Sequence, residues 1–346
     1  MTRRRRALTA LLSLVATAAL AAGCGTGLAA PAPVPVRIGY FPNITHAPAI
    51  AAVANGYFAD ALGADAQVSA STFRAGPDAV SALFSGAVDF AYIGPNPSIN
   101  AFQKSGGDAV RVIAGATSGG ASLVVRPEVA SVADLEAQVL ATPQLGNTQD
   151  VALRSWLKDH GLETDMQGGG DVSIRPQENA QTLRTFQSGD IAGAWVPEPW
   201  ATRLVQEGGG KVLVDERSLW PAGRFVTTNL VVRKDFLDAH PDLVQKVLRA
   251  HIRAIDHLAA DPGAAQRLVD DAIVELTGKG LPDDVVRTAW AKLTFTCDPV
   301  ATSLHTAAED AHDVGLLEST DVHGIYDLGP LNTVLESQNR QPVTGG

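Results

Sequence analysis

The chain of 346 residues contains 27 Lys and Arg against 37 Asp and Glu, a net charge of −10 at neutral pH. This acidic balance excludes a protein that holds nucleic acid through its phosphates, because such binding needs a basic surface. The length is sufficient for two domains.

The N-terminal segment 1–24 has the composition of a secretory signal. Arg3–Arg6 form a basic start, and an uncharged apolar run of about 16 residues follows at Ala7–Ala22. That run is too short to cross a bilayer comfortably. Small residues precede Cys24, a pattern that resembles a bacterial lipobox and predicts lipidation of Cys24. The alternative is an ordinary secretory signal followed by an incidental cysteine.

The segment 25–35 is rich in Gly, Ala and Pro and is typical of a flexible tether. Four basic residues and no acidic residue precede Cys24, so the mature chain would carry 23 basic and 37 acidic residues, a net charge of −14. The only other cysteine is Cys297, which leaves no partner for an intramolecular disulfide once Cys24 is acylated.

From Val36 onward, short β-type runs alternate with longer helical ones. We expect strands at 36–40, 67–73, 88–93 and 110–116, separated by helices at 47–58, 77–86 and 98–105. Strands that alternate with helices of this length indicate βαβ units and a mainly parallel sheet.

The middle of the chain repeats this alternation. Strands are expected at 122–126, 139–142, 172–174, 192–196, 212–214 and 227–233, with helices at 148–160 and 179–188. Four further helices are expected at 241–260, 264–277, 283–293 and 300–314. The pattern predicts an α/β fold of two lobes, with lobe I at 36–121 and 230–346 and lobe II at 122–229. Extended crossings at Ser122–Arg126 and Thr227–Val232 would act as the two hinges.

Five loops of unusual composition follow strand ends, where open α/β sheets bind ligands. They are Tyr40–His46, Gly94–Ser98, Thr117–Gly120, Gln144–Asp150 and Trp195–Trp200. Free N–H groups and the helix dipole make a helix start such as the one after Asn147 a candidate anion site. The two indoles of the last loop would supply an apolar wall with N–H donors.

The order of these segments carries a resemblance to a known family. Tyr40-Phe41-Pro42-Asn43, Gly76-Pro77, Gly86-Ala87-Val88-Asp89, Gly94-Pro95-Asn96-Pro97 and Trp195-Val196-Pro197-Glu198-Pro199-Trp200 together resemble the ABC-transporter solute-binding proteins for aliphatic sulfonates, nitrate and taurine. The similarity covers roughly Val36 to Leu331. It implies a type II periplasmic-binding-protein fold with two hinge crossings, which closes on one small ligand without catalysis or cofactor.

The resemblance also implies partners and a place in the cell. The protein would be a monomer that delivers its ligand to an ABC permease and its ATPase. Lipidation of Cys24 would anchor it at the outer face of the cytoplasmic membrane. The sulfonate binders are the most similar group, and their helix-start anion cradle maps onto 94–98 and 144–149. The ligand would then be a small organic sulfonate.

The candidate ligand-binding residues come from the five loops. They are Tyr40, Asn43, His46, Asn96, Ser118, Gln144, Asn147, Thr148, Trp195 and Glu198. Asn96, Asn147 and His46 are also natural cap residues, and Trp195 could belong to the core. A carboxylate at Glu198 would repel a sulfonate and attract an amino or amidine group. Glu198 could instead point outward or pair with Arg203 or Arg224.

Other ligands and other classes of protein remain open. A thiamine-pyrimidine-like heteroaromatic would stack on Tyr40 and Trp195, and nitrate is a third ligand. Some enzymes resemble this fold, but they are cytosolic, which the N-terminal signal argues against. A tethered sensor is a further alternative. His305, Glu309 and His312 share one face of a predicted helix, where a solvated polar face is the interpretation preferred to a metal site.

Overall fold

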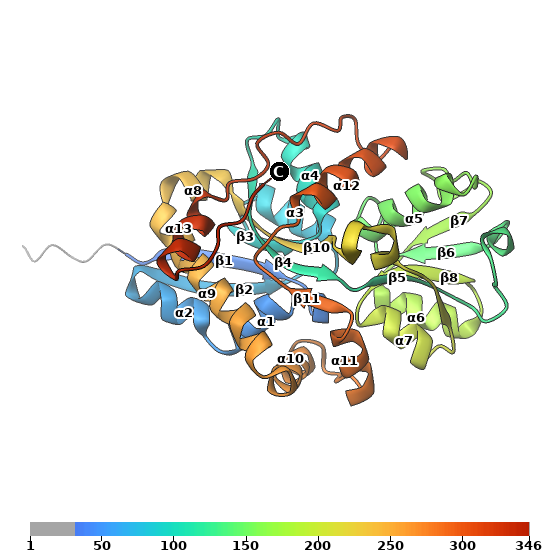
Figure 1. The fold of residues 1–346 in the computed structure, drawn as a ribbon, viewed down its shortest axis with the longest axis horizontal. Coiled ribbons are helices and arrows are strands. Elements are labelled where there is room, and N and C mark those ends of the chain that lie inside the picture. Colours follow the sequence, from blue (N-terminus) through green and yellow to red (C-terminus); the bar gives the residue numbers. More distant parts are fainter. Residues whose placement is uncertain (1–31, 346) are drawn as a thin grey trace, which may run out of the picture. The chain divides into compact units, whose positions relative to one another are not determined.

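The computed structural model describes residues 32–345, so the predicted signal, Cys24 and most of the tether lie outside the described residues. Within this range the strands form two sheets, and helices cover both faces of each sheet (Figure 1). We call each sheet with its helices a lobe. None of the helices in this part of the chain is both long and apolar enough to cross a membrane.

Lobe I is built on a six-stranded sheet with the order β11-β4-β10-β3-β1-β2. Strands β1 to β4 point the same way, while β10 and β11 run antiparallel to their neighbours. The strands are β1 (Val34–Tyr40), β2 (Ala66–Thr72), β3 (Phe90–Ile93), β4 (Val110–Gly119), β10 (Val226–Arg233) and β11 (Leu293–Phe295).

Two separate apolar cores cover the two faces of this sheet. On one face Ile38 and Leu230 pack against α1 (Ala47–Ala54), α2 (Tyr57–Leu62), α8 (Lys234–Ala239), α9 (Pro241–Ala260), α10 (Pro262–Thr277), α11 (Asp283–Trp290) and α13 (Gly329–Ser337). On the other face Ala91 and Val231 pack against α3 (Gly76–Phe84), α4 (Pro95–Lys104) and α12 (Ala301–Asp313). Alternate residues of a strand point to opposite faces, so the long apolar runs of these strands feed both cores.

Lobe II has a five-stranded sheet with the order β7-β6-β8-β5-β9. Only β5 runs against its neighbours. The strands are β5 (Ala121–Val125), β6 (Val139–Thr142), β7 (Ser173–Pro176), β8 (Gly193–Pro197) and β9 (Lys211–Asp215). Helix α5 (Thr148–Asp159) packs on one face, and α6 (Asn179–Ser188) and α7 (Trp200–Gln206) pack on the other.

The chain passes between the sheets twice, a few residues away from the predicted crossings. Ser122–Arg126 falls in and just after β5, and Thr227–Val232 falls inside β10. The first passage is instead Gly119-Gly120, where both residues have positive φ (80° and 77°). A Cβ on Gly120 would lie 2.1 Å from the end of the Leu293 side chain, which would have to move, and the positive φ favours glycine in any case.

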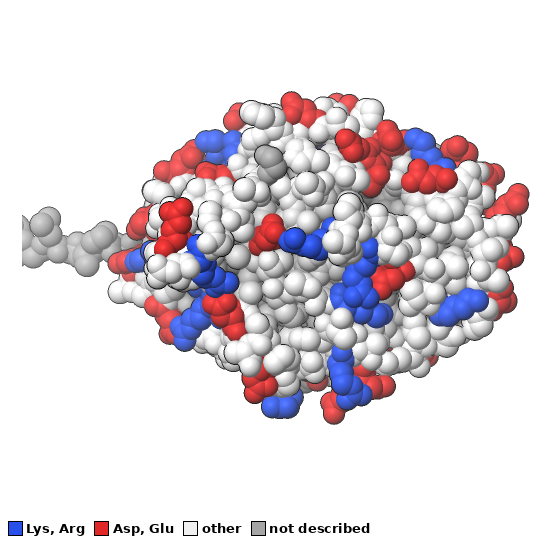
Figure 2. Space-filling view, viewed as in Figure 1, with Lys and Arg blue, Asp and Glu red and all other residues white. Residues whose placement is uncertain are grey.

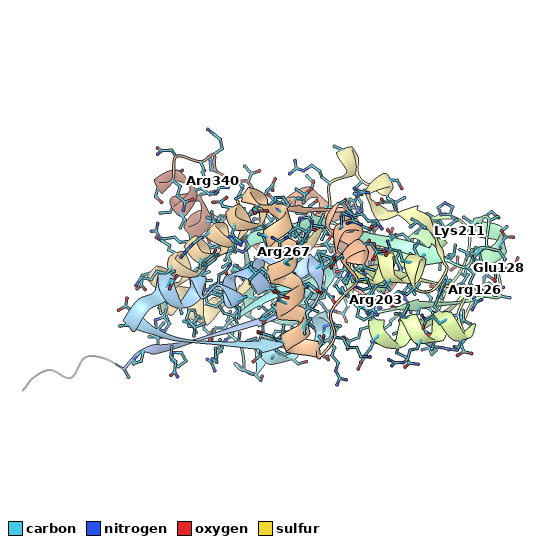
Figure 3. The ribbon with its side chains drawn as sticks, turned by 90° about the horizontal axis from the view of Figure 1, so that it is seen from below. Arg126, Glu128, Arg203, Lys211, Arg267 and Arg340 are labelled. Atoms are coloured by element: carbon cyan, nitrogen blue, oxygen red, sulfur yellow. The ribbon has the colours of Figure 1, made fainter. Side chains whose placement is uncertain are left out.

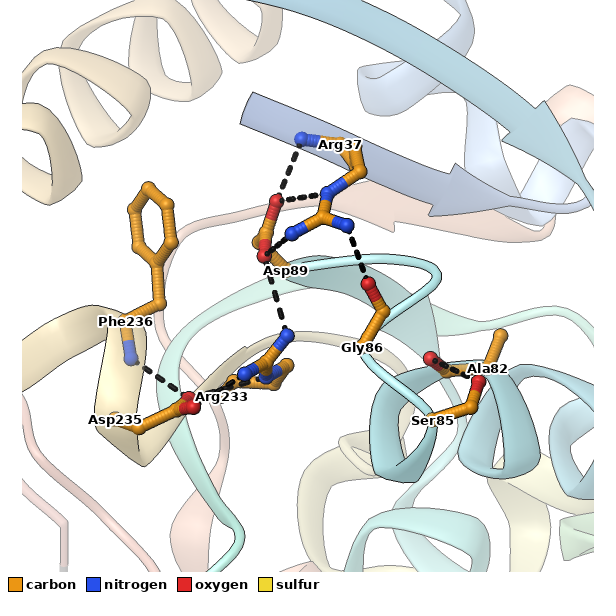
Figure 4. A network of polar contacts seen from close by, with 8 residues as sticks. All are labelled: Arg37, Ala82, Ser85, Gly86, Asp89, Arg233, Asp235 and Phe236. Carbon is orange, nitrogen blue, oxygen red and sulfur yellow. Dashed lines mark hydrogen bonds and ion pairs between the residues drawn. The ribbon is translucent and has the colours of Figure 1, made fainter. Parts of the chain in front are cut away.

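The Gly86–Asp89 segment, part of the family resemblance, has a structural role in lobe I away from the cavity. The buried Asp89 carboxylate accepts hydrogen bonds from Arg37 Nε and Nη2, both at 2.8 Å, and lies 3.5 Å from Arg233 Nη1 (Figure 4). Arg37 also donates to the Gly86 carbonyl. Arg37 lies in β1, Asp89 directly precedes β3, and Arg233 ends β10. This network therefore connects three strands of the sheet.

Most predicted elements are present within one to three residues of their expected ends. The predicted helix at 47–58 is wrong in one respect, since it breaks into α1 and α2 at Gly56, which has a φ of 67°. Helix α4 begins at Pro95 instead of Ser98, because proline fits the first position of a helix. The short elements β11, α7, α8 and α13 were not predicted from the sequence.

Candidate functional site

A small cavity of about 40 Å³ lies between the two lobes. Lobe I lines it with the loops after β1, β2 and β3 and with β10, and lobe II lines it with the loops after β6 and β7 and the end of β8. Apart from β10, which runs antiparallel and contributes its first residues, these are carboxyl ends of strands, where ligands bind in open α/β sheets. The lining residues are Phe41, Asn43, Thr45, His46, Arg74, Ala75, Gly76, Gly94, Pro97, Thr227 and Thr228 of lobe I, and Pro143, Asn147, Thr148, Gln149, Asn179 and Pro197 of lobe II.

Four helices begin at this cavity. Gly76 and Asn179 are the first residues of α3 and α6, and Gly94 and Asn147 are the N-cap residues of α4 and α5. The first N–H groups of a helix have no acceptor within the helix, and the helix dipole places partial positive charge there. Four such starts around one small space favour a negatively charged ligand.

Helices α5 and α6 carry no proline in their first turns, whereas α3 and α4 do. The Asn147 side chain caps α5 by accepting a hydrogen bond of 2.9 Å from the Asp150 N–H. The N–H groups of Thr148 and Gln149 have no protein acceptor among the described residues. They are therefore available to a ligand in the cavity.

The loop before α5 is held from behind by Asp150. Its buried carboxylate accepts hydrogen bonds from the Thr142 hydroxyl at 2.8 Å and from the Gly146 N–H at 2.9 Å. Arg154, one turn further along the helix, places its Nε 3.1 Å from the same carboxylate and is also fully buried. Arg154 thus neutralises the charge of Asp150 behind the loop, and this carboxylate does not line the cavity.

His46 lies at the end of the short 3-10 helix that follows β1. The Phe41 N–H donates to His46 Nδ1 at 3.3 Å, and the two rings lie 4.3 Å apart. Burial lowers the pKa of His46 to about 3, so the ring is neutral at ordinary pH. With Nδ1 as acceptor, the proton is on Nε2, which can donate a hydrogen bond to a ligand.

The charges at the site are few. Arg74 is the only charged side chain that lines the cavity among the described residues, and no carboxylate lines it. On the face drawn in Figure 2, acidic side chains are spread around the rim, and several basic side chains gather near the middle. The preference for an anion is therefore local to the cavity and independent of the acidic surface.

Four of the residues proposed from the sequence come together here. Asn43, His46, Asn147 and Thr148 all line the cavity. Asn43 and His46 come from lobe I, and Asn147 and Thr148 come from lobe II, so the site is completed only when the lobes meet.

Trp195 and Glu198 lie elsewhere. Trp195 is fully buried in the core of lobe II and donates from Nε1 to Glu216 Oε2 at 2.7 Å. Glu198 is also fully buried, and its carboxylate accepts from Lys292 Nζ at 2.7 Å and from the Thr202 N–H at 3.0 Å. The sequence-based pairing of Glu198 with Arg203 or Arg224 was wrong.

The remaining candidates do not line the cavity. Tyr40 belongs to the apolar core of lobe I. Asn96 donates from Nδ2 to the Ala307 carbonyl at 2.9 Å, which joins α4 to α12. Ser118 lies in β4, paired with β10 and β11. Gln144 reaches toward Asp78 across the cleft, with 3.5 Å between the two polar atoms.

Several lining residues were missed by sequence reasoning. Arg74 and Asn179 lie just after β2 and β7, so the strand-end rule would have found them had it been applied to every strand. Thr227 and Thr228 lie in a strand and carry no signal in the sequence that separates them from other strand threonines. Only their position in the fold places them at the cavity.

No group of three His, Cys, Asp or Glu side chains in the range 32–345 is arranged to hold a metal ion. His305, Glu309 and His312 lie on α12 with exposed side chains. Cys297 is buried as a free thiol.

Comparison with known families gives a match over residues 29–271 to the model of the NMT1-like family. The chain belongs to the NMT1-like family. The match covers well over half of the sequence and includes all of lobe II. The family resemblance expected from the loops is thereby confirmed.

One curated relative in this group is the taurine-binding periplasmic protein of Escherichia coli, which is 30% identical over 215 residues. The matched stretch is 62% of this chain and 64% of the relative, just under two thirds of its length.

Solved structures with the same fold include the alkanesulfonate-binding protein from Xanthomonas axonopodis pv. citri bound to MOPS. Its TM-score is 0.69 at 21% identity, over 83% of this chain and 96% of that one. The periplasmic nitrate-binding protein from Synechocystis PCC 6803 gives a TM-score of 0.70 at 15% identity, over 88% and 89%. The protein therefore has the periplasmic-binding-protein fold, and the relatives named here are binding proteins, not enzymes.

Proposed function

We propose that this protein is the extracytoplasmic solute-binding component of an ABC importer for aliphatic sulfonates. The observation that carries the proposal is the cavity between the lobes, which is lined by four helix starts and by no carboxylate. Hydrogen-bond donors at such starts suit the oxygens of a sulfonate head. The Thr148 and Gln149 N–H groups, the neutral His46 ring and the Arg74 guanidinium would provide these donors.

Binding would act through closure of the lobes. Lining residues from both lobes face one cavity, so a ligand that contacts both stabilises the closed form. The Gly119-Gly120 passage and the segment 216–225 before β10 would serve as hinges. An ABC permease would recognise the closed form and receive the ligand, and its ATPase would drive transport.

The heteroaromatic alternative depended on stacking by Tyr40 and Trp195, with Glu198 or His46 fixing the ring nitrogens. Of these four residues only His46 lines the cavity. Tyr40 and Trp195 are core residues, and the Glu198 carboxylate is paired with Lys292. Nitrate shares the anion chemistry of the site and is therefore tested together with the sulfonates.

Membrane attachment through Cys24 rests on the sequence alone, because this residue lies outside the described range. We propose that Cys24 is lipidated after signal cleavage. A Cys24→Ala variant would then appear in the extracytoplasmic soluble fraction instead of the membrane fraction. Membrane retention of the variant would contradict lipidation at this residue.

The function is tested by thermal unfolding of the protein with alkanesulfonates, taurine, nitrate and a thiamine-pathway pyrimidine. A ligand that binds only the native state, at a hundred times its Kd, adds about 2.7 kcal/mol of stability. The proposal predicts this increase with sulfonates. Stabilisation by nitrate alone or by the pyrimidine alone would overturn the ligand assignment while leaving a binding protein.

A further inference from the structure

A larger groove lies next to the cavity. It measures about 730 Å³ and shares Asn43, Arg74 and Asn179 with the cavity. Both lobes line it: lobe I with the loops after β1 and β2 and the end of α10, and lobe II with α6 and α7. A ligand that extends from the cavity into the groove has to pass the shared residues.

Two contacts join the lobes at this boundary. Arg74 Nη1 lies 2.5 Å from Glu178 Oε1, and Trp200 Nε1 donates to Asn43 Oδ1 at 3.0 Å. In each pair the residue of lobe I lines both cavity and groove, and its partner in lobe II lines the groove. The two contacts therefore lie across the route between the two spaces.

The two contacts differ in how readily they open. The side chains of Arg74 and Glu178 are 76% and 56% exposed, and ion pairs in water contribute little to stability. The Trp200 indole is held from outside by Arg203, labelled in Figure 3, whose guanidinium lies 4.7 Å from the ring centre. The ion pair is therefore the contact that yields to a long ligand.

The groove offers an apolar surface beyond this boundary. Phe73, Leu183, Trp200 and Leu281 line it, with Arg184 and Lys279 among the charged residues. Such a surface suits the alkyl or aryl tail of an organic anion whose head occupies the cavity.

We infer that the Arg74–Glu178 ion pair is a length gate for the ligand. A short sulfonate fits in the cavity, and the pair closes over it. A long sulfonate keeps its head at the helix starts and places its tail in the groove, and the pair must then separate. This inference rests on the proposed function and assigns Glu178 as a specificity-determining residue outside the anion site.

The test compares ethanesulfonate with hexanesulfonate by titration calorimetry, together with propanoate and heptanoate as carboxylates of matched tail length. The variant is Glu178→Gln, which keeps the side-chain shape and leaves Arg74 in place for the anion. The control is Arg340→Ala, which breaks the exposed Arg340–Asp256 pair on lobe I, well separated from Arg203 in Figure 3. We expect Glu178→Gln to improve the affinity for the long ligand relative to the short one by about two- to fivefold.

Each outcome decides one of the two proposals. The gate is overturned if the ratio of long-ligand to short-ligand affinity in Glu178→Gln equals that of the wild type and of Arg340→Ala. An equal change in affinity for both ligands gives this same result. Binding of carboxylates without binding of sulfonates overturns the proposed ligand class, and the ratio for the carboxylates then decides the gate. Absence of binding for all four anions overturns both.

Discussion

Gly94 of lobe I and Thr148 of lobe II meet across the cleft with no room for a further side chain. A Cβ built on Gly94 would lie 2.2 Å from Thr148 Oγ1. The φ of Gly94 is −70°, which any residue can adopt, so space and not backbone conformation requires glycine here. The starts of α4 and α5 approach one another at this point, which makes the contact a sensitive measure of closure.

Gly94→Ala is therefore expected to hinder closure and weaken sulfonate binding about 5- to 150-fold, because overpacking of a tight contact typically costs about 1–3 kcal/mol. Calorimetry with ethanesulfonate measures the effect. Gly263→Ala is the control, since a Cβ there meets no atom closer than 3.5 Å. Wild-type affinity in Gly94→Ala would show that this contact plays no part in binding.

The charge at the start of α5 gives a second prediction. Asp caps a helix as well as Asn does, so Asn147→Asp should keep the free energy of unfolding near its wild-type value. The added carboxylate at the cavity should weaken sulfonate binding at least tenfold through like-charge repulsion. Asn147→Ala should instead lower the free energy of unfolding by about 1 kcal/mol, as measured by urea denaturation. Unchanged sulfonate affinity in Asn147→Asp would place the anion away from α5.

The ion pair between Glu198 and Lys292 joins the end of β8 in lobe II to the segment before β11 in lobe I. Lys292→Met should destabilise the protein by about 2–3 kcal/mol, because it leaves a buried carboxylate unpaired. The double variant Glu198→Gln, Lys292→Met should lose less than Lys292→Met alone, since no unpaired charge remains. Urea denaturation of both variants measures this. An equal loss of unfolding free energy in the single and double variants would mean that the unpaired charge of Glu198 does not cause the destabilisation.

Glu216 predicts a pH dependence of stability. Burial raises its pKa from the ordinary 4.5 to about 7, although the Trp195 N–H partly offsets the effect. The folded state then binds a proton that the unfolded state has lost, so this group reduces stability as pH rises from 4.5 to 7, and the loss stays constant above that.

Glu216→Gln removes the charge and keeps an acceptor for Trp195. We expect it to be more stable than the wild type by roughly 1–3 kcal/mol at pH 8 and to show no such gain at pH 4. Thermal unfolding across this pH range measures the difference, with the exposed Glu128→Gln as control. An advantage for Glu216→Gln that does not change with pH would rule out ionisation as its cause.

The sequence by itself determined the alternation of strands and helices and the loops at the strand ends. Both depend on local patterns: apolar periodicity sets each element, and a cap such as Asn147 sets where the next helix begins. Asn43, His46, Asn147 and Thr148 could be found in this way, because a loop after a parallel strand must emerge at the binding edge of the sheet.

Only the tertiary structure decided which polar side chains line the cavity and which hold the lobes together. Trp195 lies in β8 and Glu198 directly follows this strand, but their partners, Glu216 and Lys292, lie 21 and 94 residues away in the sequence. Thr228 reached the cavity only because β10 returns to lobe I beside β3. Burial of a polar group depends on a partner brought close by folding, and the local pattern around that group contains no record of the partner.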